Sequence, residues 1–304
     1  AKTVQDAIKE IPEQPLDFYV NEQTLEVTVE YRNGKYNFMA QNAEDYPVAQ
    51  GLEEGIKHSV ELSSNFLFEA TNRALFATAE DTLRPVMNGV YFDVKKDQLT
   101  VVATDGHKLA YSKLLQIENI EEASFILPRK PATLLKGLIG KEDVNVTLQF
   151  DGRTAHIATP DFQLVCRLIE GAYPEYARVI PHDNANIVVV NRDAMISALR
   201  RMLIFSSQVS SLVRLRLENS KLTISTQDTD FSQSAQEAML CDYSGTPMSI
   251  GFKGPFLLEL LNNLQCDEVE FRLSDASSAG LILPATQEEN REVVMLLMPM
   301  MLND

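Results

Sequence analysis

Residues 125–140, FILPRKPATLLKGLIG, join a short apolar strand, a proline at a helix entry and a leucine-rich helical run. The same order returns in residues 249–264, SIGFKGPFLLELLNNL. Each copy leads into alternating strand-like runs, VNVTLQF, RTAHIA and FQLVCRLI after the first and VEFRLS, AGLILP and EVVMLLMP after the second. The opening residues repeat this unit without its first strand, because the helical run KTVQDAIKEI precedes LDFYVN, TLEVTVEY and KYNFMAQ. Repetition of this kind predicts one recurring structural unit.

A second type of unit alternates with the first. Residues 60–105 begin VELSSNFLFEATNRALFATAED and residues 188–228 begin VVVNRDAMISALRRMLIFSS, so each has a strand, an amphipathic helix and two further strands. The alternation predicts half a domain at 1–57 and whole domains at 58–184 and 185–304, and we expect the chain to begin partway through its first domain. Few helices and many strands indicate an α+β fold with helices on one face of antiparallel sheets.

The composition restricts the classes of function. A net charge of −16 over 304 residues should repel DNA and acidic membranes, so nucleic-acid binding requires local clusters of positive charge. No apolar stretch is long enough to cross a bilayer and the first residues do not resemble a secretion signal, which favours a soluble cytoplasmic protein. The three cysteines are far apart without a CxxC pair, and no histidines have metal-binding spacing, so we expect neither disulfide nor cofactor.

Residues 101–114, VVATDGHKLAYSKL, allow two interpretations. Asp105 and His107 are two positions apart, so on a strand they would share a face and could act as an acid–base pair. No nucleophile is nearby, and the chain contains no P-loop, GxGxxG or GxSxG motif. Asp-Gly is also a strong turn signal. The turn of a hairpin is therefore the favoured interpretation, and a hydrolase is the alternative.

The last residues, VVMLLMPMMLND at 293–304, are unusually apolar for a chain end. The first part is typical of a core strand, but Pro299 should end that strand because proline cannot donate to a central ladder. Met300, Met301 and Leu302 should then lie near the surface, where methionine suits an adaptable site for a partner.

TDGHKLA, the loop EGAYPEYARVIP at 170–181 and the ending MPMML, in this order over a repeated α+β chain, resemble the bacterial sliding clamps, the beta subunits of DNA polymerase III. The resemblance covers the whole chain but begins partway into the family's first domain. It implies a head-to-tail dimer whose closed ring surrounds duplex DNA, with helices inside and sheets outside.

The resemblance also implies a function without catalysis, cofactor or membrane. The ring would tether the polymerase III alpha subunit, the clamp loader and other proteins that carry a clamp-binding peptide, in the cytoplasm at the nucleoid. Two alternatives stay open, a DNA-independent interaction scaffold and a hydrolase that uses Asp105 and His107.

By the same resemblance, a partner-peptide pocket lies between the second and third domains. Its residues are Thr104, Gly106, His107, Lys108, Leu109, Pro174, Arg178, Val179, Phe256, Met298, Pro299, Met300, Met301 and Leu302. The chain departs from the family at several of them. Lys108 stands where arginine is common, Phe256 replaces a tyrosine, Met301 replaces a basic residue, and Asn303 and Asp304 extend past the usual end.

Basic residues gather on the predicted helices at 129–141 and 191–203, whereas the predicted helix at 64–79 is neutral, with Arg73 against Glu69. As DNA-facing residues we predict Arg73, Arg129, Lys130, Lys136, Lys141, Arg192, Arg200 and Arg201. Ordinary solvated helix faces are the alternative. No aromatic stacking platform accompanies them, so we expect no reading of DNA sequence. For the dimer, the resemblance points to Tyr36 and Phe38 of the strand at 35–39, and to Ile204 and Phe205; burial within each domain would account for these residues equally well.

Overall fold

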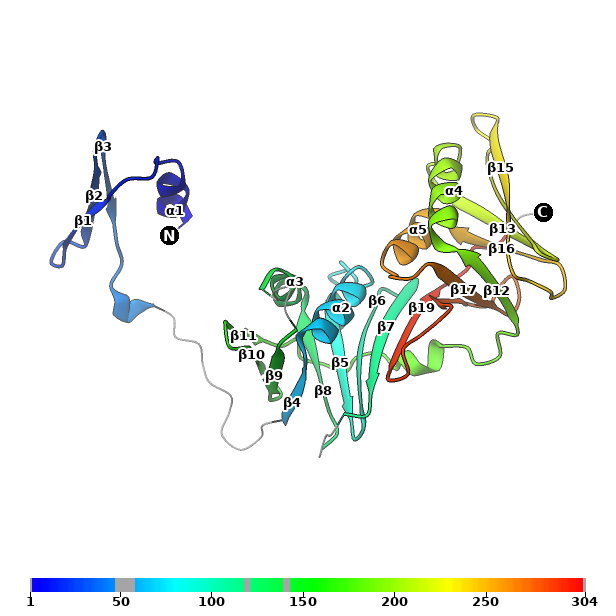
Figure 1. Ribbon diagram of the computed structural model, residues 1–304, viewed down its shortest axis with the longest axis horizontal. Helices are drawn as coiled ribbons and strands as arrows, with labels where there is room; N and C mark the ends of the chain where they lie inside the picture. The colour runs from blue at the N-terminus through cyan, green and yellow to red at the C-terminus, as the bar shows by residue number, and fades with distance from the viewer. Residues whose placement is uncertain (1, 47–57, 118–120, 139–142, 303–304) are drawn as a thin grey trace. The chain divides into compact units, whose positions relative to one another are not determined.

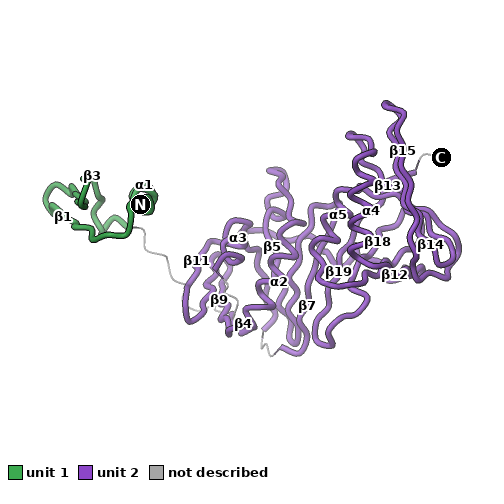
Figure 2. The backbone as a smooth tube through the Cα atoms, turned by 45° about the horizontal axis from the view of Figure 1, so that its top comes forward, with its two compact units in different colours: residues 1–50 green, residues 51–304 purple. Residues whose placement is uncertain are grey.

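The computed structural model describes residues 2–46, 58–117, 121–138 and 143–302, and the chain forms two compact units, 1–50 and 51–304 (Figure 2). The first unit contains helix α1 (Lys2–Lys9) and an antiparallel sheet of strands β1 (Asp17–Asn21), β2 (Glu26–Tyr31) and β3 (Gly34–Met39). Among residues 2–46, only Val27 and Val29 are buried, and no residue of α1 is.

The second unit contains three sheets, all antiparallel in the described part of the chain. The first has β4 (His58–Ser63), β9 (Asn145–Phe150), β10 (Thr154–Ala158) and β11 (Gln163–Arg167). The second has β13 (Leu212–Glu218), β14 (Lys221–Asp228), β15 (Gln233–Leu240) and β16 (Met248–Lys253). Each sheet combines strands from both types of repeated unit, since β4 pairs with β9 and β13 pairs with β16.

A long sheet of eight strands connects the two repeats. Its order is β12 (Asn186–Asn191), β17 (Glu268–Leu273), β18 (Gly280–Pro284), β19 (Arg291–Leu297), β7 (Lys108–Leu115), β6 (Gln98–Thr104), β5 (Gly89–Lys95) and β8 (Ala123–Pro128). The central pair, β19 and β7, joins strands more than 170 residues apart in sequence, with Leu296 opposite Leu109. Because β19 and β7 are hydrogen-bonded to each other, one continuous sheet runs through both repeats, and the two repeats form one unit.

Four helices cover one side of this sheet (Figure 1). They are α2 (Ser64–Leu75), α3 (Arg129–Leu138), α4 (Arg192–Ile204) and α5 (Gly254–Asn262). α2 packs beside α3 and α4 beside α5, so the repeated units place their helices in the same way. The side chains of Ser63 and Asn191 accept hydrogen bonds from the first turns of α2 and α4, which fixes where both helices begin. The predicted α+β class, with helices on one face of antiparallel sheets, is confirmed.

Helix α2 is shorter than the predicted 64–79, which is a correction to the sequence prediction. The Thr78 side chain and backbone both donate to the carbonyl of Leu75, at 2.8 and 3.3 Å. Ala77 donates to Ala74, so the chain tightens into a turn of i to i+3 bonds after Leu75. The threonine hydroxyl thereby satisfies a carbonyl at the helix end.

The two faces of the long sheet have separate apolar clusters. Alternate residues such as Val101, Ala110 and Met295 face the helices and belong to the main core. Their neighbours Val102 and Leu109 belong to a smaller cluster on the opposite face. The loop after β11 covers part of this second cluster, which brings the loop beside the junction of β7 and β19.

Candidate partner-docking site

The turn between β6 and β7 is built by its own side chains. The carboxylate of Asp105 accepts hydrogen bonds from the backbone N–H groups of His107 and Lys108, at 2.8 and 2.9 Å. Thr104 Oγ1 donates to the Lys108 carbonyl at 2.8 Å, and Gly106 has φ +90°, a conformation that favours glycine. One Asp105 oxygen is thus used by the backbone and the other by the Lys108 ammonium, so the aspartate shapes the turn.

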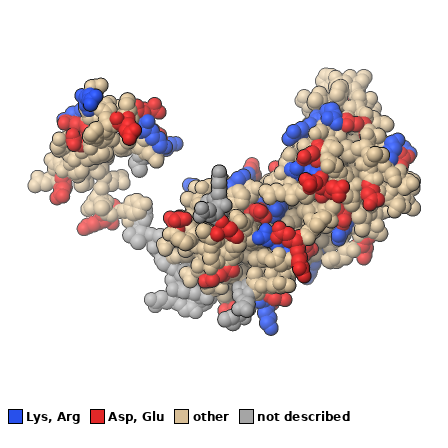
Figure 3. All heavy atoms as spheres, viewed as in Figure 1, with Lys and Arg blue, Asp and Glu red and all other residues tan. Residues whose placement is uncertain are grey.

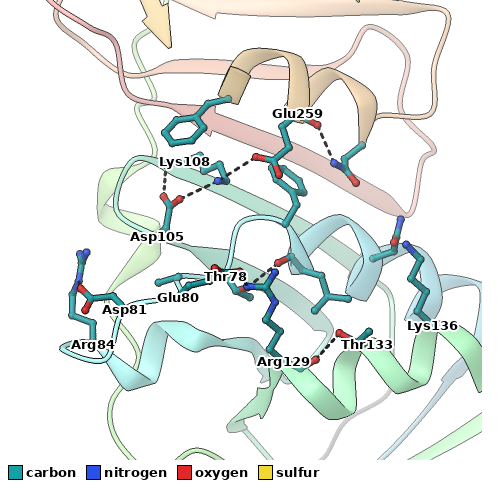
Figure 4. A pocket seen from close by; sticks show the side chains of 16 residues that line it. Thr78, Glu80, Asp81, Arg84, Asp105, Lys108, Arg129, Thr133, Lys136 and Glu259 are labelled. Atoms are coloured by element: carbon teal, nitrogen blue, oxygen red, sulfur yellow. Dashed lines mark hydrogen bonds and ion pairs between the residues drawn. The ribbon is translucent and has the colours of Figure 1, made fainter. Parts of the chain in front are cut away.

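Lys108 is buried, with 7% of its surface exposed, on the helix side of the turn. Its Nζ lies 3.1 Å from the Asp105 carboxylate and 3.3 Å from that of Glu259 on α5. The same ammonium lies 4.4 Å from the ring centre of Phe256, within the range of a cation–π contact. Figure 4 shows Lys108 between the two acids, in a cavity of about 750 Å³ between α2, α3 and α5. Lys108 therefore links the turn to α5.

The end of the chain lies against this turn. Strand β19 ends at Leu297, as predicted from Pro299. The N–H of Met298 donates to the His107 carbonyl at 2.9 Å, and that of Met300 donates to Gly251 on β16 at 2.8 Å. A Cβ at Gly251 would lie 2.7 Å from both Met300 O and Leu302 Cδ2, so only glycine permits this close approach.

The loop after β11 is anchored by two tyrosines. Tyr173 accepts a hydrogen bond from the backbone N–H of Thr104 at 3.0 Å and stacks on Tyr91 at 4.6 Å. Tyr176 donates to Asp93 at 2.7 Å. Burial raises the pKa of both Tyr173 and Tyr176, so both phenols stay neutral. The turn, the chain end and the loop are thus held together, although sequence reasoning missed both tyrosines as anchors.

We define the docking surface as the turn 104–108, Phe256 and the chain end 298–302, flanked by the loop 174–179. The His107 and Phe256 rings lie 6.4 Å apart, and Met298 and Met301 are 44% and 73% exposed. Pro174, Arg178 and Val179 are also exposed, although Arg178 is paired with Glu175 at 2.9 Å.

Two residues predicted to present their side chains to a partner need correction, because Lys108 is buried between Asp105 and Glu259 and Leu109 is buried as well. Leu109 was expected to present its side chain to a partner, but only 1% of its surface is exposed. It points to the opposite face of the sheet from Ala110, into the smaller apolar cluster beneath Tyr173 and Tyr176. Leu109 therefore packs beneath the loop.

Phe256 has a neighbour that the sequence did not suggest. The Lys253 ammonium lies 4.6 Å from the Phe256 ring centre, so this ring contacts both Lys253 and Lys108. The phenylalanine stands where a tyrosine was expected, and without a hydroxyl it makes only apolar and cation–π contacts. No sequence signal identifies this arrangement, because it depends on where α5 packs.

The predicted DNA-facing residues differ in their surroundings. Arg73 is a correction, because it is 8% exposed and donates to Ser112 Oγ at 2.9 Å within the unit. Arg192 is half-buried, and its Nε donates to the carbonyl of Leu261 at the end of α5. Lys141 lies outside the described residues. The exposed members are Arg129, Lys130, Lys136, Arg200 and Arg201, of which Arg129 pairs with Glu80 and Arg201 with Glu237.

The surface view agrees with this division. Over the second unit in Figure 3, Lys and Arg atoms alternate with Asp and Glu atoms and do not form one uniform basic surface.

For the predicted dimer contacts, Tyr36 is 41%, Ile204 74% and Phe205 42% exposed, while Phe38 is partly buried. Within residues 2–46, 58–117, 121–138 and 143–302, no three His, Cys, Asp or Glu side chains form a metal-binding group. No helix in the same ranges is long and apolar enough to cross a membrane.

Comparison with known proteins identifies the family. Residues 61–175 match the central domain and residues 177–301 the C-terminal domain of the DNA polymerase III beta subunit. The chain is 30% identical to the beta sliding clamp of Pseudomonas aeruginosa over 97% of its own length and 80% of that protein. A crystal structure of the clamp from the same organism, with a ligand, superposes with a TM-score of 0.89 at 28% identity, covering 99% of this chain and 81% of the other. The Thermotoga maritima beta subunit gives 0.86 at 25% identity, with 99% and 80% covered. The chain therefore belongs to the DNA polymerase III beta subunits, the bacterial sliding clamps, which are non-catalytic processivity factors of DNA replication.

Proposed function

We propose that this sliding clamp works as a head-to-tail dimer that encircles duplex DNA, with α2, α3, α4 and α5 facing the DNA and the sheets outside. Residues 1–57, 58–184 and 185–304 would be its partial first domain and its second and third domains. The placement of all four helices on one side of the long sheet supports this arrangement. The ring would act in the cytoplasm at the nucleoid, where bacterial DNA is replicated.

Partner proteins would dock a short peptide with an apolar end on the docking surface. These partners include the polymerase III alpha subunit and the clamp loader. The observation that carries this proposal is the chain end, which is bonded to the turn at His107 and leaves Met298 and Met301 exposed. Burial of each apolar peptide side chain contributes about 1.5–3 kcal/mol, and ordering the peptide costs about 2–5 kcal/mol. The balance gives affinities of roughly micromolar order, which suits exchange between partners.

The docking proposal is tested by fluorescence anisotropy with a labelled peptide that carries glutamine and leucine. Met301→Asp should weaken binding about tenfold or more, because a carboxylate replaces an apolar contact. Phe231→Asp is the matched control, since Phe231 is 72% exposed and Met301 73%, and Phe231 lies in the turn between β14 and β15. Equal affinities of the two variants would refute the docking surface. Deleting residues 298–304 should abolish binding and leave the central domain folded.

Encircling of DNA is tested with nicked circular DNA loaded with the clamp. Linearising the DNA should release the protein, because a ring slides off an end. Retention that does not change on linearisation would contradict topological tethering. Absence of any retention, together with intact peptide binding, would instead favour a scaffold that does not need DNA.

The dimer would join Tyr36 and Phe38 of one copy to Ile204 and Phe205 of another. Ile204→Asp places a charge on a side chain that is 74% exposed, so it should leave the fold intact and shift the native mass to the monomer. Leu83→Asp, at a side chain 86% exposed, is the control and should keep the mass of the wild type. An unchanged mass for Ile204→Asp would exclude this contact.

A further inference from the structure

Lys253 brings an ammonium group without an acidic partner to the edge of the docking surface. It is the last residue of β16, and its Nζ lies 4.6 Å from the centre of the Phe256 ring. Lys253 pairs with no carboxylate in the described part of the chain. A cation–π contact satisfies none of the N–H donors of an ammonium with an oxygen acceptor. The group can therefore donate hydrogen bonds to a bound partner.

The geometry of β16 directs the Lys253 side chain toward the end of the chain. Phe252 is fully buried in the main core. Because side chains alternate between the two faces of a strand, Gly251 and Lys253 face the other way. On that face, a Cβ at Gly251 would lie 2.7 Å from Leu302 Cδ2. Lys253 therefore emerges on the same face as Leu302, beside the apolar chain end of the docking surface.

The other charged groups at the docking surface already have partners. Lys108 is paired with Asp105 and Glu259, and Arg178 is paired with Glu175. Both acids that hold Lys108 line the cavity on the helix side, and Lys253 does not line that cavity. Within residues 104–108, 174–179, 251–256 and 298–302, Lys253 is thus the only lysine or arginine without a carboxylate partner.

Docking on the Phe256 ring would change the solvation of this ammonium. Lys253 and Phe256 are both partly buried before any partner binds. An apolar side chain packed on the ring would remove further water from Lys253, and an unpaired charge that loses water is destabilising. A carboxylate of the same partner would replace that water with a charge-assisted hydrogen bond. A neutral amide forms a weaker bond and a cation is repelled, so the surroundings of Lys253 favour an acidic side chain.

We propose that Lys253 determines specificity at the docking surface, by favouring peptides with an aspartate or glutamate next to the apolar side chain that packs on Phe256. The inference rests on the proposed function, because it states which peptides the docking surface accepts best. The ammonium of Lys253 binds the side-chain carboxylate, while the ring of Phe256 and the chain end 298–302 bind the apolar part of the peptide.

Labelled docking peptides that differ at one position test the proposal by fluorescence anisotropy. The variable residue is aspartate, asparagine or lysine, placed directly before the leucine in one series and directly after it in another. All peptides are amidated, so a side chain is the source of the carboxylate. In at least one series, wild type should bind the aspartate peptide about two- to fivefold more tightly than the asparagine peptide.

Two variants and a control assign this preference to Lys253. Lys253→Gln should remove the preference for aspartate and leave the affinity for the asparagine peptide unchanged. Lys253→Glu should favour the lysine peptide instead. The matched control is Lys130→Gln, because Lys130 also lacks a carboxylate partner among the described residues but lies on α3. This control should keep the preference of the wild type.

The outcomes separate the inference from the proposed function. If no peptide binds, or if Met301→Asp and Phe231→Asp bind the asparagine peptide equally well, the docking surface fails and the inference fails with it. If the asparagine peptide binds and depends on Met301, but wild type and Lys253→Gln show the same ratio of aspartate to asparagine affinity in both series, the inference fails alone. Equal weakening of all three peptides by Lys253→Gln would mean that Lys253 only holds the Phe256 ring, which would also overturn the inference.

Discussion

Lys108→Met should destabilise the second unit by about 2 kcal/mol. This value follows from the ion pairs that Asp105 and Glu259 lose when the ammonium is removed. Removing one member of a fully buried ion pair costs about 3–5 kcal/mol, and a surface pair about 0–1 kcal/mol. Asp105 keeps its two backbone N–H bonds, and Glu259 is 41% exposed and can rehydrate. The loss should therefore lie between the two limits, with the contact to Phe256 included.

The measurement is equilibrium urea unfolding followed by circular dichroism, because the chain has no tryptophan. Lys136→Met is the control, since Lys136 lines the same cavity but is exposed, and it should change stability by less than about 0.5 kcal/mol. Lys108→Arg keeps the positive charge and should recover most of the loss. If Lys108→Met matched Lys136→Met, the ion pairs would not hold the turn to α5, and the reasoning would be wrong.

Three further outcomes follow from buried or paired groups. Burial would raise the pKa of Glu292, but hydrogen bonds from Lys113 and Tyr111 outweigh burial and lower the pKa. The ionised Glu292 therefore stabilises the fold above the usual carboxyl pKa, and this stabilisation fades as pH falls. The difference in urea midpoint between wild type and Glu292→Gln should shrink between neutral pH and about pH 4. Burial raises the pKa of Cys166 to about 11, so mass spectrometry should find it alkylated at mildly alkaline pH far more slowly than in the unfolded chain, and equal rates would contradict its burial. Arg73→Met should lower the urea midpoint yet leave retention on circular DNA unchanged, whereas reduced retention would return Arg73 to the DNA-facing set.

Local patterns predicted the elements and the turn. The 3.6-residue period predicted 191–203 as a helix, and α4 covers Arg192–Ile204. Pro299 predicted the end of β19, because proline lacks an N–H. Asp-Gly predicted the turn at 105–106, where Gly106 has φ +90°, a conformation that favours glycine. These features depend on residues adjacent in sequence, which is why they could be predicted.

Burial across the junction could not be predicted in this way. Arg73 was predicted to face DNA because it is a basic residue on a predicted helix, but it is buried and donates to Ser112 on β7. Leu109 was predicted to face a partner because of the family resemblance, but the loop at Tyr173 covers its cluster. In both cases the deciding contacts come from strands or loops dozens to hundreds of residues away, and a local pattern contains no information about them.

The pairing of the basic residues bears on how an acidic chain could hold DNA. Lys130, Lys136 and Arg200 pair with no carboxylate in the described part of the chain, whereas Arg129 and Arg201 each pair with a glutamate. For each phosphate contact, affinity falls by about 0.9 logarithmic units for every tenfold rise in salt concentration. A few unpaired cations per subunit therefore give weak, salt-sensitive attraction to DNA. A closed ring does not need more, because topology prevents release while weak contacts permit sliding. Salt should therefore release the protein from linear DNA far more readily than from circles.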